Sequence, residues 1–483
     1  MASSSSRNRQ QTAGLANNIQ PYRMHVSQRY LDLTKQKLEL TRLPRDARGA
    51  QQQTYDFGVS KTDLEPLIDH WLEQYDWRTQ ETFFNDTLPQ FRASVNGTRV
   101  HFVHRKSRSP NAVPLLFIHG FPDSFISVAP MIEALCDPIS TPPRGHENVH
   151  AFHVVAPSIP GFGFSDPTAE EGNAMPTTAA TFDALMKMLG YNQYIAHGCG
   201  WGFRISRMLA LGCPGSCLAI HTVNPEVPPP RFASMPLAWL KFQLAKLTFA
   251  FLPRSDFGYA PQEVAYGGAP STPMSDSSLP SSVFSRPTDR PQTLAYGLCD
   301  SPPGLLAYML DAIRPPTLSG ITRRSSGQGA SHAFRTSLSP ITSPIAERSP
   351  QPYQDRGPPA ELPRLSTVWT PTAIINWTMI YWLPGPEVAL RWLYNSTSLV
   401  QSLWLSYCNV PVAITQFQDV EKASGGRGQP PVQRVEAYHP IAMLVRREGR
   451  VRFASWERPA EVVMDLRALA SHLSSAWGMR GAM

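Results

Sequence analysis

The stretch that decides the fold is Ala196-His197-Gly198-Cys199-Gly200-Trp201-Gly202-Phe203. An apolar run ending at Ile195 precedes it, and an amphipathic segment from Arg204 to Leu211 follows it. The order is therefore strand, tight turn and helix, which is the setting of a nucleophile elbow.

A nucleophile elbow needs small residues two positions before and two positions after its apex, because its strained backbone leaves no space for larger side chains. Gly198 and Gly202 meet this requirement and make Gly200 the apex. The apex is normally Ser, Cys or Asp, whose side chain attacks carbon, whereas Gly200 has no side chain. A frame with Cys199 at the apex fails, since two large residues would then occupy the small positions. The sequence thus predicts the support of a nucleophile without the nucleophile.

Composition bounds the class of protein. The chain has 483 residues, of which 42% are hydrophobic and 10% aromatic, enough for two or three domains with a large core. Its net charge is +7, but the basic residues are scattered, which argues against a nucleic-acid partner. Its six cysteines lack zinc-type spacing and favour reduced thiols. We find neither a secretory signal nor a transmembrane segment, and expect an intracellular, cytoplasmic protein.

Runs that are apolar on both faces alternate with helical stretches along the chain. These runs are Pro114–Ile118, Phe152–Ala156, Gln193–Ala196, Ala219–Val223 and Val410–Ile414. Strands buried on both faces are typical of a parallel sheet that helices cover. The sequence therefore predicts an α/β fold, with a mostly parallel sheet flanked by helices. A hairpin around Asn96-Gly97 and a last helix over residues 460–476 complete the predicted core.

Changes in composition and periodicity divide the chain into five parts. They are a disordered tail (residues 1–20), an N-terminal segment with helices (21–112), the first part of the α/β core (113–230), a helical lid (231–405) and the second part of the core (406–483). Within the lid, residues 263–286 and 318–366 are rich in Ser, Pro, Gly and Arg and have no periodicity. We interpret both as loops or disordered insertions.

Further motifs lie on both sides of the elbow. They are Gln36-Lys37-Leu38-Glu39-Leu40-Thr41-Arg42-Leu43-Pro44, Tyr75-Asp76-Trp77-Arg78, His119-Gly120-Phe121-Pro122, Arg290-Pro291-Gln292-Thr293-Leu294-Ala295-Tyr296-Gly297-Leu298 and Asp300-Ser301-Pro302-Pro303-Gly304-Leu305. In this order the chain resembles the microsomal-type epoxide hydrolases, including their fungal members. The resemblance implies an α/β-hydrolase fold with an N-terminal helical segment and a helical lid.

The resemblance also implies a mechanism. In such enzymes an Asp at the apex attacks the epoxide carbon while two lid tyrosines donate hydrogen bonds to the epoxide oxygen. A His, oriented by an acid, then activates the water that hydrolyses the ester. Carried over by position, the tyrosines are Tyr259 and Tyr381, and the oxyanion donors are the amides of Phe121 and Trp201. The resemblance implies a lipophilic small molecule as substrate or ligand, with no cofactor and no metal.

The three charged members of that mechanism are substituted. The nucleophile slot is Gly200, the base slot is Arg452, and the acid slot is Val420, with Asp419 and Glu421 adjacent. Removing a catalytic nucleophile typically costs on the order of a million-fold in turnover. Loss of nucleophile and base together therefore argues against the ordinary covalent mechanism.

Two functions follow, and the sequence leaves both open. The first is an epoxide hydrolase-like protein acting on a lipophilic epoxide in fungal secondary-metabolite biosynthesis, in which Tyr259 and Tyr381 polarise the epoxide while water or a substrate hydroxyl attacks directly. The second is an inactive family member that binds a small molecule or a partner protein, or a decayed gene product. Among the histidines, His439 is nearest in sequence to the lost base. We expect His119 and His197 to be structural.

Overall fold

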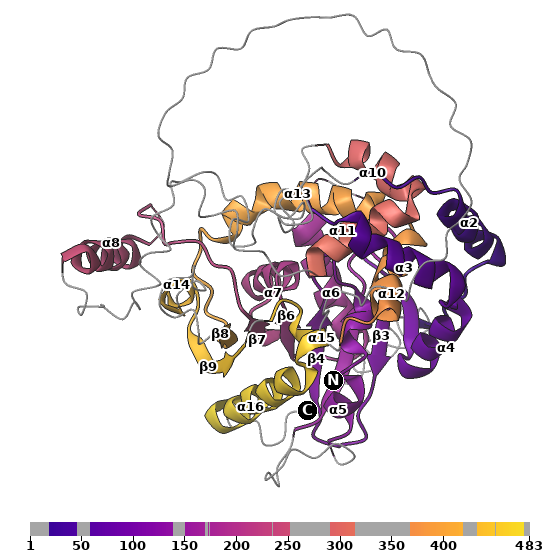
Figure 1. Cartoon of the computed structure of the whole chain (residues 1–483). Helices are drawn as coiled ribbons and strands as arrows, with labels where there is room; N and C mark the ends of the chain where they lie inside the picture. Colours follow the sequence, from indigo (N-terminus) through magenta and orange to yellow (C-terminus); the bar gives the residue numbers. More distant parts are fainter. Residues whose placement is uncertain are drawn as a thin grey trace, which may run out of the picture.

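The computed structural model describes residues 19–45, 58–138, 150–169, 172, 174–233, 235–251, 290–313, 368–418, 432–449 and 451–477. Among these residues one nine-stranded sheet runs through the molecule in the order β1-β2-β3-β5-β4-β6-β7-β8-β9 (Figure 1). The strands are β1 (Ile19–Tyr22), β2 (Gln90–Val95), β3 (Thr98–Arg105), β4 (Val113–Ile118), β5 (Phe152–Pro157), β6 (Tyr194–Gly198), β7 (Cys217–Val223), β8 (Val412–Gln418) and β9 (Ile441–Glu448).

The sheet is antiparallel at one side and parallel over the rest. Pairing is antiparallel from β1 through β2 and β3 to β5, and parallel from β5 through β4, β6, β7 and β8 to β9. The turn between β2 and β3 has positive φ at both Asn96 and Gly97, as a two-residue hairpin of this sequence requires. The predicted α/β fold with a mostly parallel sheet is confirmed.

Two differences from the predicted segments concern ends of elements. β1 begins at Ile19, inside the predicted tail, because residues 19–22 pair with β2. β8 continues to Gln418, four residues beyond the predicted end at Ile414, because its second half pairs with β9. Thr415, Gln416 and Gln418 are polar, so the apolar run that marked the strand stops at Ile414. The two predicted insertions, 263–286 and 318–366, lie outside the described residues.

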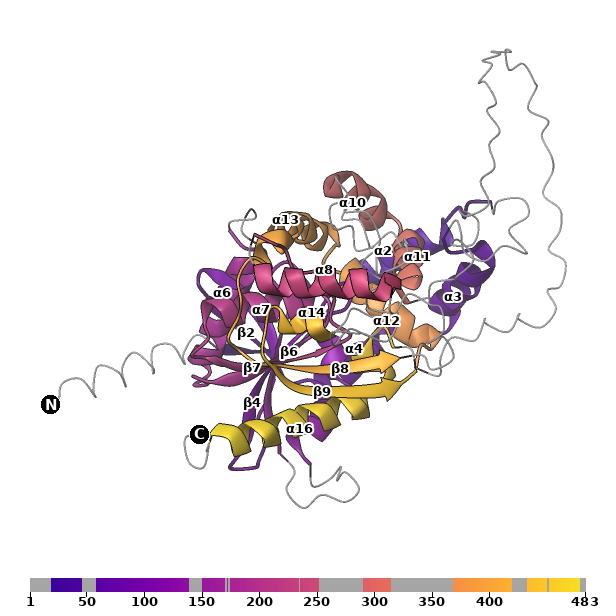
Figure 2. The ribbon, with the colours of Figure 1, turned by 90° about the vertical axis from the view of Figure 1, so that its left-hand side faces the viewer.

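Each face of the sheet has its own core. Leu115 and Phe117 of β4 pack in the cluster that includes α5 (Ile132–Cys136) and α16 (Pro459–Trp477). Leu116 and Ile118 pack on the other face, in the cluster that includes α6 (Ala174–Met188) and α7 (Trp201–Gly212). Successive side chains of a strand point to opposite faces, so a run that is apolar throughout is buried on both. Figure 2 shows α16 below the strands and α6 and α7 above them.

Helices inserted between β7 and β8 form the described part of the lid (Figure 1). They are α8 (Pro236–Phe251), α10 (Pro291–Asp300), α11 (Pro302–Ile313), α12 (Pro371–Trp382) and α13 (Glu387–Leu403). Shorter helices are η1 (Phe125–Val128), α14 (Val432–Glu436) and α15 (Ala454–Glu457). No described helix is long and apolar enough to cross a membrane.

The N-terminal segment fixes α12 in place. It contributes α2 (Gln28–Glu39), α3 (Lys61–Glu73) and α4 (Trp77–Thr87). The Tyr75 hydroxyl donates to Asn376 Oδ1 at 2.8 Å, and the Trp382 indole donates to Thr34 Oγ1 at 2.8 Å. Both acceptor-donor pairs join residues about 300 or more positions apart in sequence. The helix that carries Tyr381 is therefore held from its outer side by the N-terminal segment.

Candidate active site

Strand register brings two turns together at the carboxyl edge of the sheet. β4 and β6 are parallel neighbours, and Ile118 pairs with Gly198. The chain leaves β4 through His119-Gly120 and leaves β6 through the elbow. A Cβ added to Gly120 would lie 3.0 Å from the carbonyl oxygen of Cys199, so these two turns are in contact. Clefts at this edge of a parallel sheet are the usual place for ligands.

The elbow is sterically locked by its two outer glycines. A Cβ added to Gly198 would lie 2.4 Å from the carbonyl carbon of Gly202, and one added to Gly202 would lie 2.3 Å from the carbonyl oxygen of Ile118. Both obstacles are backbone atoms, which cannot move aside cheaply. Backbone atoms therefore exclude any side chain at both Gly198 and Gly202, which is the requirement that the sequence indicated.

The apex itself has room. Gly200 adopts φ 54° and ψ −116°, on the left-handed side of backbone space that favours glycine. A Cβ added there would meet no atom of the described residues within 4 Å, apart from its chain neighbours. The backbone thus has the shape of a nucleophile elbow, and the space into which a nucleophile would project is open.

The two predicted oxyanion donors lie next to this apex. Trp201 is the first residue of α7, so its N–H has no acceptor within the helix. A Cβ on Gly120 would lie 3.7 Å from that nitrogen, and Phe121 follows Gly120 directly. The amides of Phe121 and Trp201 therefore belong to turns that contact each other beside Gly200.

Tyr381 reaches the same place from the lid. Its ring centroid is 5.8 Å from that of Phe121 and 6.2 Å from that of Phe162. Its hydroxyl donates to the backbone carbonyl oxygen of Asp123 at 2.6 Å. Burial raises the pKa of Tyr381 well above its ordinary value, with a further contribution from the Asp123 carboxylate, so the hydroxyl keeps its proton and stays a donor.

A second lid tyrosine joins it, one that sequence reasoning missed. Tyr308 of α11 has its ring centroid 6.4 Å from that of Phe121, and after burial and Asp123 it is the third contributor to the raised pKa of Tyr381. Burial raises the pKa of Tyr308 too. It follows the lid signature by three residues, and that proximity was the available signal.

Asp123 is the other residue that the sequence did not single out. It is 9% exposed and directly follows the His-Gly-Phe-Pro turn. Its Oδ1 accepts hydrogen bonds from the Trp456 indole at 3.1 Å and from the Ser124 N–H at 2.9 Å. Burial nevertheless raises the pKa of this carboxyl from 3.8 to about 6. A carboxylate immediately after the His-Gly-Phe-Pro turn, which carries a predicted oxyanion donor, was the signal in the sequence.

Arg452 occupies the loop of the base slot, after β9. Asn224, at the end of β7, donates from Nδ2 to the carbonyl oxygen of Val451 at 3.1 Å and so anchors this loop to the core. Burial lowers the pKa of Arg452, and the carboxylates of Asp311, Glu457 and Glu226 oppose that shift. A guanidinium stays protonated and has no acceptor, so Arg452 cannot serve as a general base.

Three histidines considered from the sequence are structural. The two ring nitrogens of His119 contact the Gly120 carbonyl at 2.8 Å and the Ile159 N–H at 3.1 Å. His197 lies behind the elbow, with Nδ1 2.8 Å from Nδ1 of His221. His439 is fully buried between Arg207 and the Val410 carbonyl. Burial lowers the pKa of all three rings.

Comparison with known proteins matches these features. The sequence profile of the epoxide hydrolase N terminus matches residues 19–128, and that of the alpha/beta hydrolase fold matches residues 113–283. A relative from Stigmatella aurantiaca, named "Putative epoxide hydrolase", is 32% identical over 293 residues, which are 61% of this chain and 59% of the relative. Together these matches support an epoxide hydrolase family member of the α/β hydrolase superfamily. It spans about 59% to 62% of the length of the curated relatives it matches first.

Other members of the family are more distant. Epoxide hydrolase 1 of Sus scrofa is 28% identical over 300 residues, 61% of this chain and 62% of the relative. Among solved structures, Aspergillus niger epoxide hydrolase has a TM-score of 0.62 at 21% identity, over 94% of this chain and 96% of that one. Juvenile hormone epoxide hydrolase from Bombyx mori has a TM-score of 0.68 at 20% identity, over 95% of both chains. These two likenesses concern the fold.

Part of the predicted site lies outside the described residues. This is so for Tyr259 in the lid and for the acid slot, Val420 with Asp419 and Glu421. β8 ends at Gln418, immediately before that slot, and Asn224 Oδ1 accepts from the Phe417 N–H at 2.9 Å. The epoxide hydrolase family positions described here are therefore the apex, the oxyanion turns, Tyr381 and the base slot.

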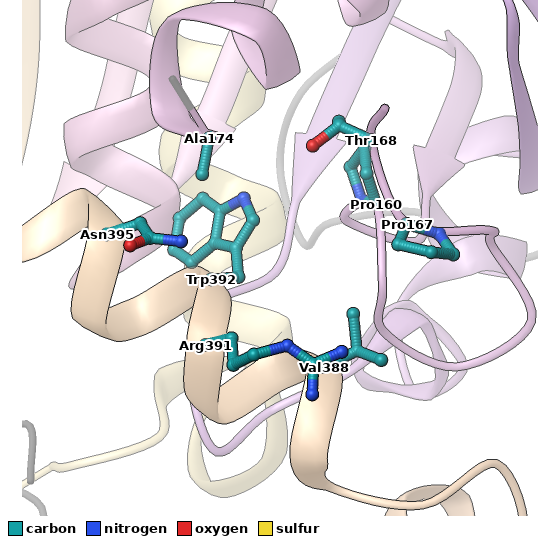
Figure 3. Close-up of a pocket in the computed structure, with 8 residues that line it drawn as sticks. All are labelled: Pro160, Pro167, Thr168, Ala174, Val388, Arg391, Trp392 and Asn395. Atoms are coloured by element: carbon teal, nitrogen blue, oxygen red, sulfur yellow. The ribbon is translucent and has the colours of Figure 1, made fainter. Parts of the chain in front are cut away.

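A small pocket lies beside these positions, between α13 and the core (Figure 3). Figure 3 shows Val388, Arg391, Trp392 and Asn395 of α13 on one side and Pro160, Pro167 and Thr168 on the other, with Ala174 at the start of α6. The Trp392 ring centroid is 5.5 Å from that of Trp201 and 5.6 Å from that of Phe162. The pocket thus adjoins the aromatic side chains around the elbow.

Proposed function

We propose that this chain binds a lipophilic small-molecule epoxide beneath its lid and opens it by direct attack of water, without forming an ester to the protein. The observation that carries this proposal is the elbow: its backbone strain and its locked glycines are those of a nucleophile mount, yet Gly200 offers no attacking atom. Arg452 likewise offers no base for cleaving an ester.

Electrophilic assistance is the part of the family mechanism that the described residues support. Tyr381 and Tyr308 are neutral hydroxyl donors that flank Phe121. A donor aimed at an epoxide oxygen stabilises the negative charge that develops when the ring opens, which is worth about two to three powers of ten in rate for a single donor. For this role the Tyr381 hydroxyl exchanges its present acceptor, the Asp123 carbonyl, for the epoxide oxygen.

Aromatic side chains around the elbow support a lipophilic substrate. Phe121, Phe162, Trp201 and Trp392 contact one another between the core and the lid. Apolar and aromatic walls with few polar groups are typical of small-molecule sites. Relatives from Ctenocephalides felis are named juvenile hormone epoxide hydrolases, and one from the fungus Dothistroma septosporum, 30% identical over 218 residues, is named "Putative epoxide hydrolase". As part of the proposal, we assign the substrate to fungal secondary metabolism, and that fungal relative supports the assignment.

The test is turnover of a simple aryl epoxide such as styrene oxide, with wild type compared against Tyr381→Phe. Wild type is expected to produce the diol, and the variant is expected to lose about a hundredfold in kcat. A matched control is Tyr296→Phe, because Tyr296 of α10 is 73% exposed.

Two outcomes would contradict the proposal. Equal rates in wild type and Tyr381→Phe would remove the tyrosine from the reaction. Binding of the epoxide by calorimetry with no diol would favour the second reading of the sequence, a family member that binds without turnover. The substituted base slot is the observation that makes that second function worth testing.

A further inference from the structure

Asp123 sits where three parts of the molecule meet. Its carbonyl oxygen accepts from Tyr381 of α12, and its Oδ1 accepts from Trp456 of α15. Burial raises the pKa of the Cys199 thiol, the neighbour of the empty apex, and the negative charge of Asp123 adds to that shift. The lid helix α12 and the helix α15 therefore contact this residue, and its charge acts on the elbow. Figure 1 shows α12 and α15 in the same region, and the Trp377 and Trp456 ring centroids lie 6.2 Å apart.

The groups around this carboxyl are neutral. The titratable ones are Tyr381 on α12, Cys199 at the elbow and His119 in the preceding turn. Burial raises the pKa of the tyrosine and of the thiol, the latter to about 12, and lowers that of His119 to about 4. Within the described residues Asp123 forms no ion pair with a lysine or an arginine.

Other buried carboxylates of the core are paired differently. Asp183 of α6 binds the Lys187 ammonium at 2.6 Å, and Asp465 of α16 binds the Arg447 guanidinium. Burying a carboxylate without a cation disfavours its charged form and lowers stability at neutral pH. A residue kept in that state beside a reaction site is a candidate for proton transfer.

An unpaired donor lies close to the same carboxyl. Trp377 is 1% exposed, and its Nε1 finds no acceptor among the described residues. Its N–H lies close enough to Asp123 to stabilise the carboxylate as a donor and lower its pKa, without reaching the distance and angle of a hydrogen bond. A buried N–H without a partner is uncommon and costly. An indole N–H that donates and a carboxylate that accepts, side by side, are the two partners that hold and orient a water molecule.

We propose that Asp123 is the general base of this site and that it activates a water molecule held between its carboxylate and the Trp377 indole. The proposal rests on the proposed function, direct attack of water on an epoxide. Asp123, which follows the turn that contains Phe121, then takes the role of general base that a histidine at position 452 would have had.

The step balances with water and epoxide alone. The water oxygen forms a bond to one epoxide carbon as the bond from that carbon to the ring oxygen breaks, and Asp123 takes the proton that the water releases. Tyr381 gives its proton to the resulting alkoxide. The Asp123 carboxylic acid then returns a proton to the tyrosinate by way of a water molecule, since the contact of Tyr381 with this residue is to its main-chain carbonyl oxygen. The product is a diol, and both residues return to their starting states.

Substitution of Trp456 tests the role of Asp123 through the pH dependence of kcat/KM, which would not change if Asp123 were purely structural. The Trp456 indole N–H stabilises the Asp123 carboxylate, so Trp456→Phe raises the pKa of that carboxyl. A hydrogen bond to a charged group corresponds to about one pKa unit. The acid limb of the kcat/KM profile is therefore expected to move from about pH 6 to about pH 7 in the variant.

The experiment measures kcat/KM for styrene oxide against pH in wild type and four variants. Asp123→Asn is expected to lose on the order of a hundredfold to ten-thousandfold, and Asp123→Glu to recover part of that loss. Trp456→Phe is expected to shift the acid limb as above. Asp183→Asn, the control for loss of a buried carboxyl, is expected to leave the position of that limb unchanged.

Failures are distinguishable. Diol formation by wild type with an unaltered rate in Asp123→Asn, or an unmoved acid limb in Trp456→Phe, would overturn the assignment of the base while direct hydrolysis stands. Absence of diol in wild type would overturn the proposed function, and this assignment with it. Circular dichroism of each variant identifies any that does not fold, and Asp123→Glu and Trp456→Phe then carry the test.

Discussion

Asp123→Asn is expected to make the folded protein more stable above about pH 6. Burial raises the pKa of this carboxyl from 3.8 to about 6, so the folded state binds the proton more tightly than the unfolded chain does. A raised folded pKa contributes stability that is fully present below the unfolded pKa, near 3.8, and is lost as pH rises through the folded pKa, near 6. Ionised Asp123 therefore destabilises the wild-type fold at neutral pH.

The size of the effect follows from the shift. A difference of roughly two pKa units, at about 1.4 kcal/mol per unit, amounts to about 3 kcal/mol between acidic and mildly alkaline solution. Asn has the same shape, can accept the bonds from Trp456 and Ser124 through its amide oxygen, and carries no charge. The variant is expected to gain most of this difference at about pH 8 and to match wild type at about pH 3.5.

The assay is urea unfolding of wild type and variant at both pH values, with Asp183→Asn as the control of opposite sign. Burial raises the pKa of Asp183, but hydrogen bonds from Lys187, Tyr194 and Cys213 outweigh it and lower the pKa overall. Its contribution to stability is present above the unfolded pKa and is lost as pH falls through the folded pKa, so its variant is expected to be less stable than wild type at about pH 8. If Asp123→Asn were no more stable than wild type there, the claim of a costly buried carboxylate would be refuted.

Three further predictions concern the elbow and the support of the lid. Gly200→Asp is expected to form an ester with styrene oxide, seen as added mass on the intact protein. That ester is expected to persist longer than the one formed by a variant that also carries Arg452→His. A folded Gly200→Asp variant without added mass would contradict this. Gly198→Ala is expected to destabilise the fold by about 3 kcal/mol or more, because its new Cβ would lie 2.4 Å from a backbone atom. Gly200→Ala is expected to cost about 1 to 2 kcal/mol, from backbone strain alone. Equal urea midpoints for these two variants would be inconsistent with the elbow. Tyr75→Phe leaves Asn376 Oδ1 without its donor and is expected to lower the unfolding free energy by about 1 kcal/mol, measured by urea titration; no change would show that this contact does not hold α12.

The elbow could be predicted because its rules are local. Steric limits at Gly198 and Gly202 act within one turn and its neighbouring strand, so three glycines at alternate positions after an apolar run specify the backbone. Strands buried on both faces could be recognised for a similar reason, since β4 and β7 are apolar along their length or nearly so. The N-cap of α3 depends on an equally local contact, in which the Ser60 side chain accepts from the Asp63 N–H.

The proton chemistry of the site could not be predicted in that way. Asp123 meets Tyr381 and Trp456, which are 258 and 333 positions away, and a pattern in one segment carries no information about such contacts. The loop of Arg452 is likewise fixed by Asn224, 227 positions before its neighbour Val451. Burial, which decides the pKa of each of these groups, is a property of the folded chain alone.

The most direct test of the account is a single turnover of styrene oxide in water enriched in oxygen-18, with protein in excess over epoxide. Direct attack by water predicts that the first diol formed carries the heavy oxygen in full. Diol that carries ordinary oxygen from a carboxylate of the protein, or epoxide bound covalently to the chain, would contradict it.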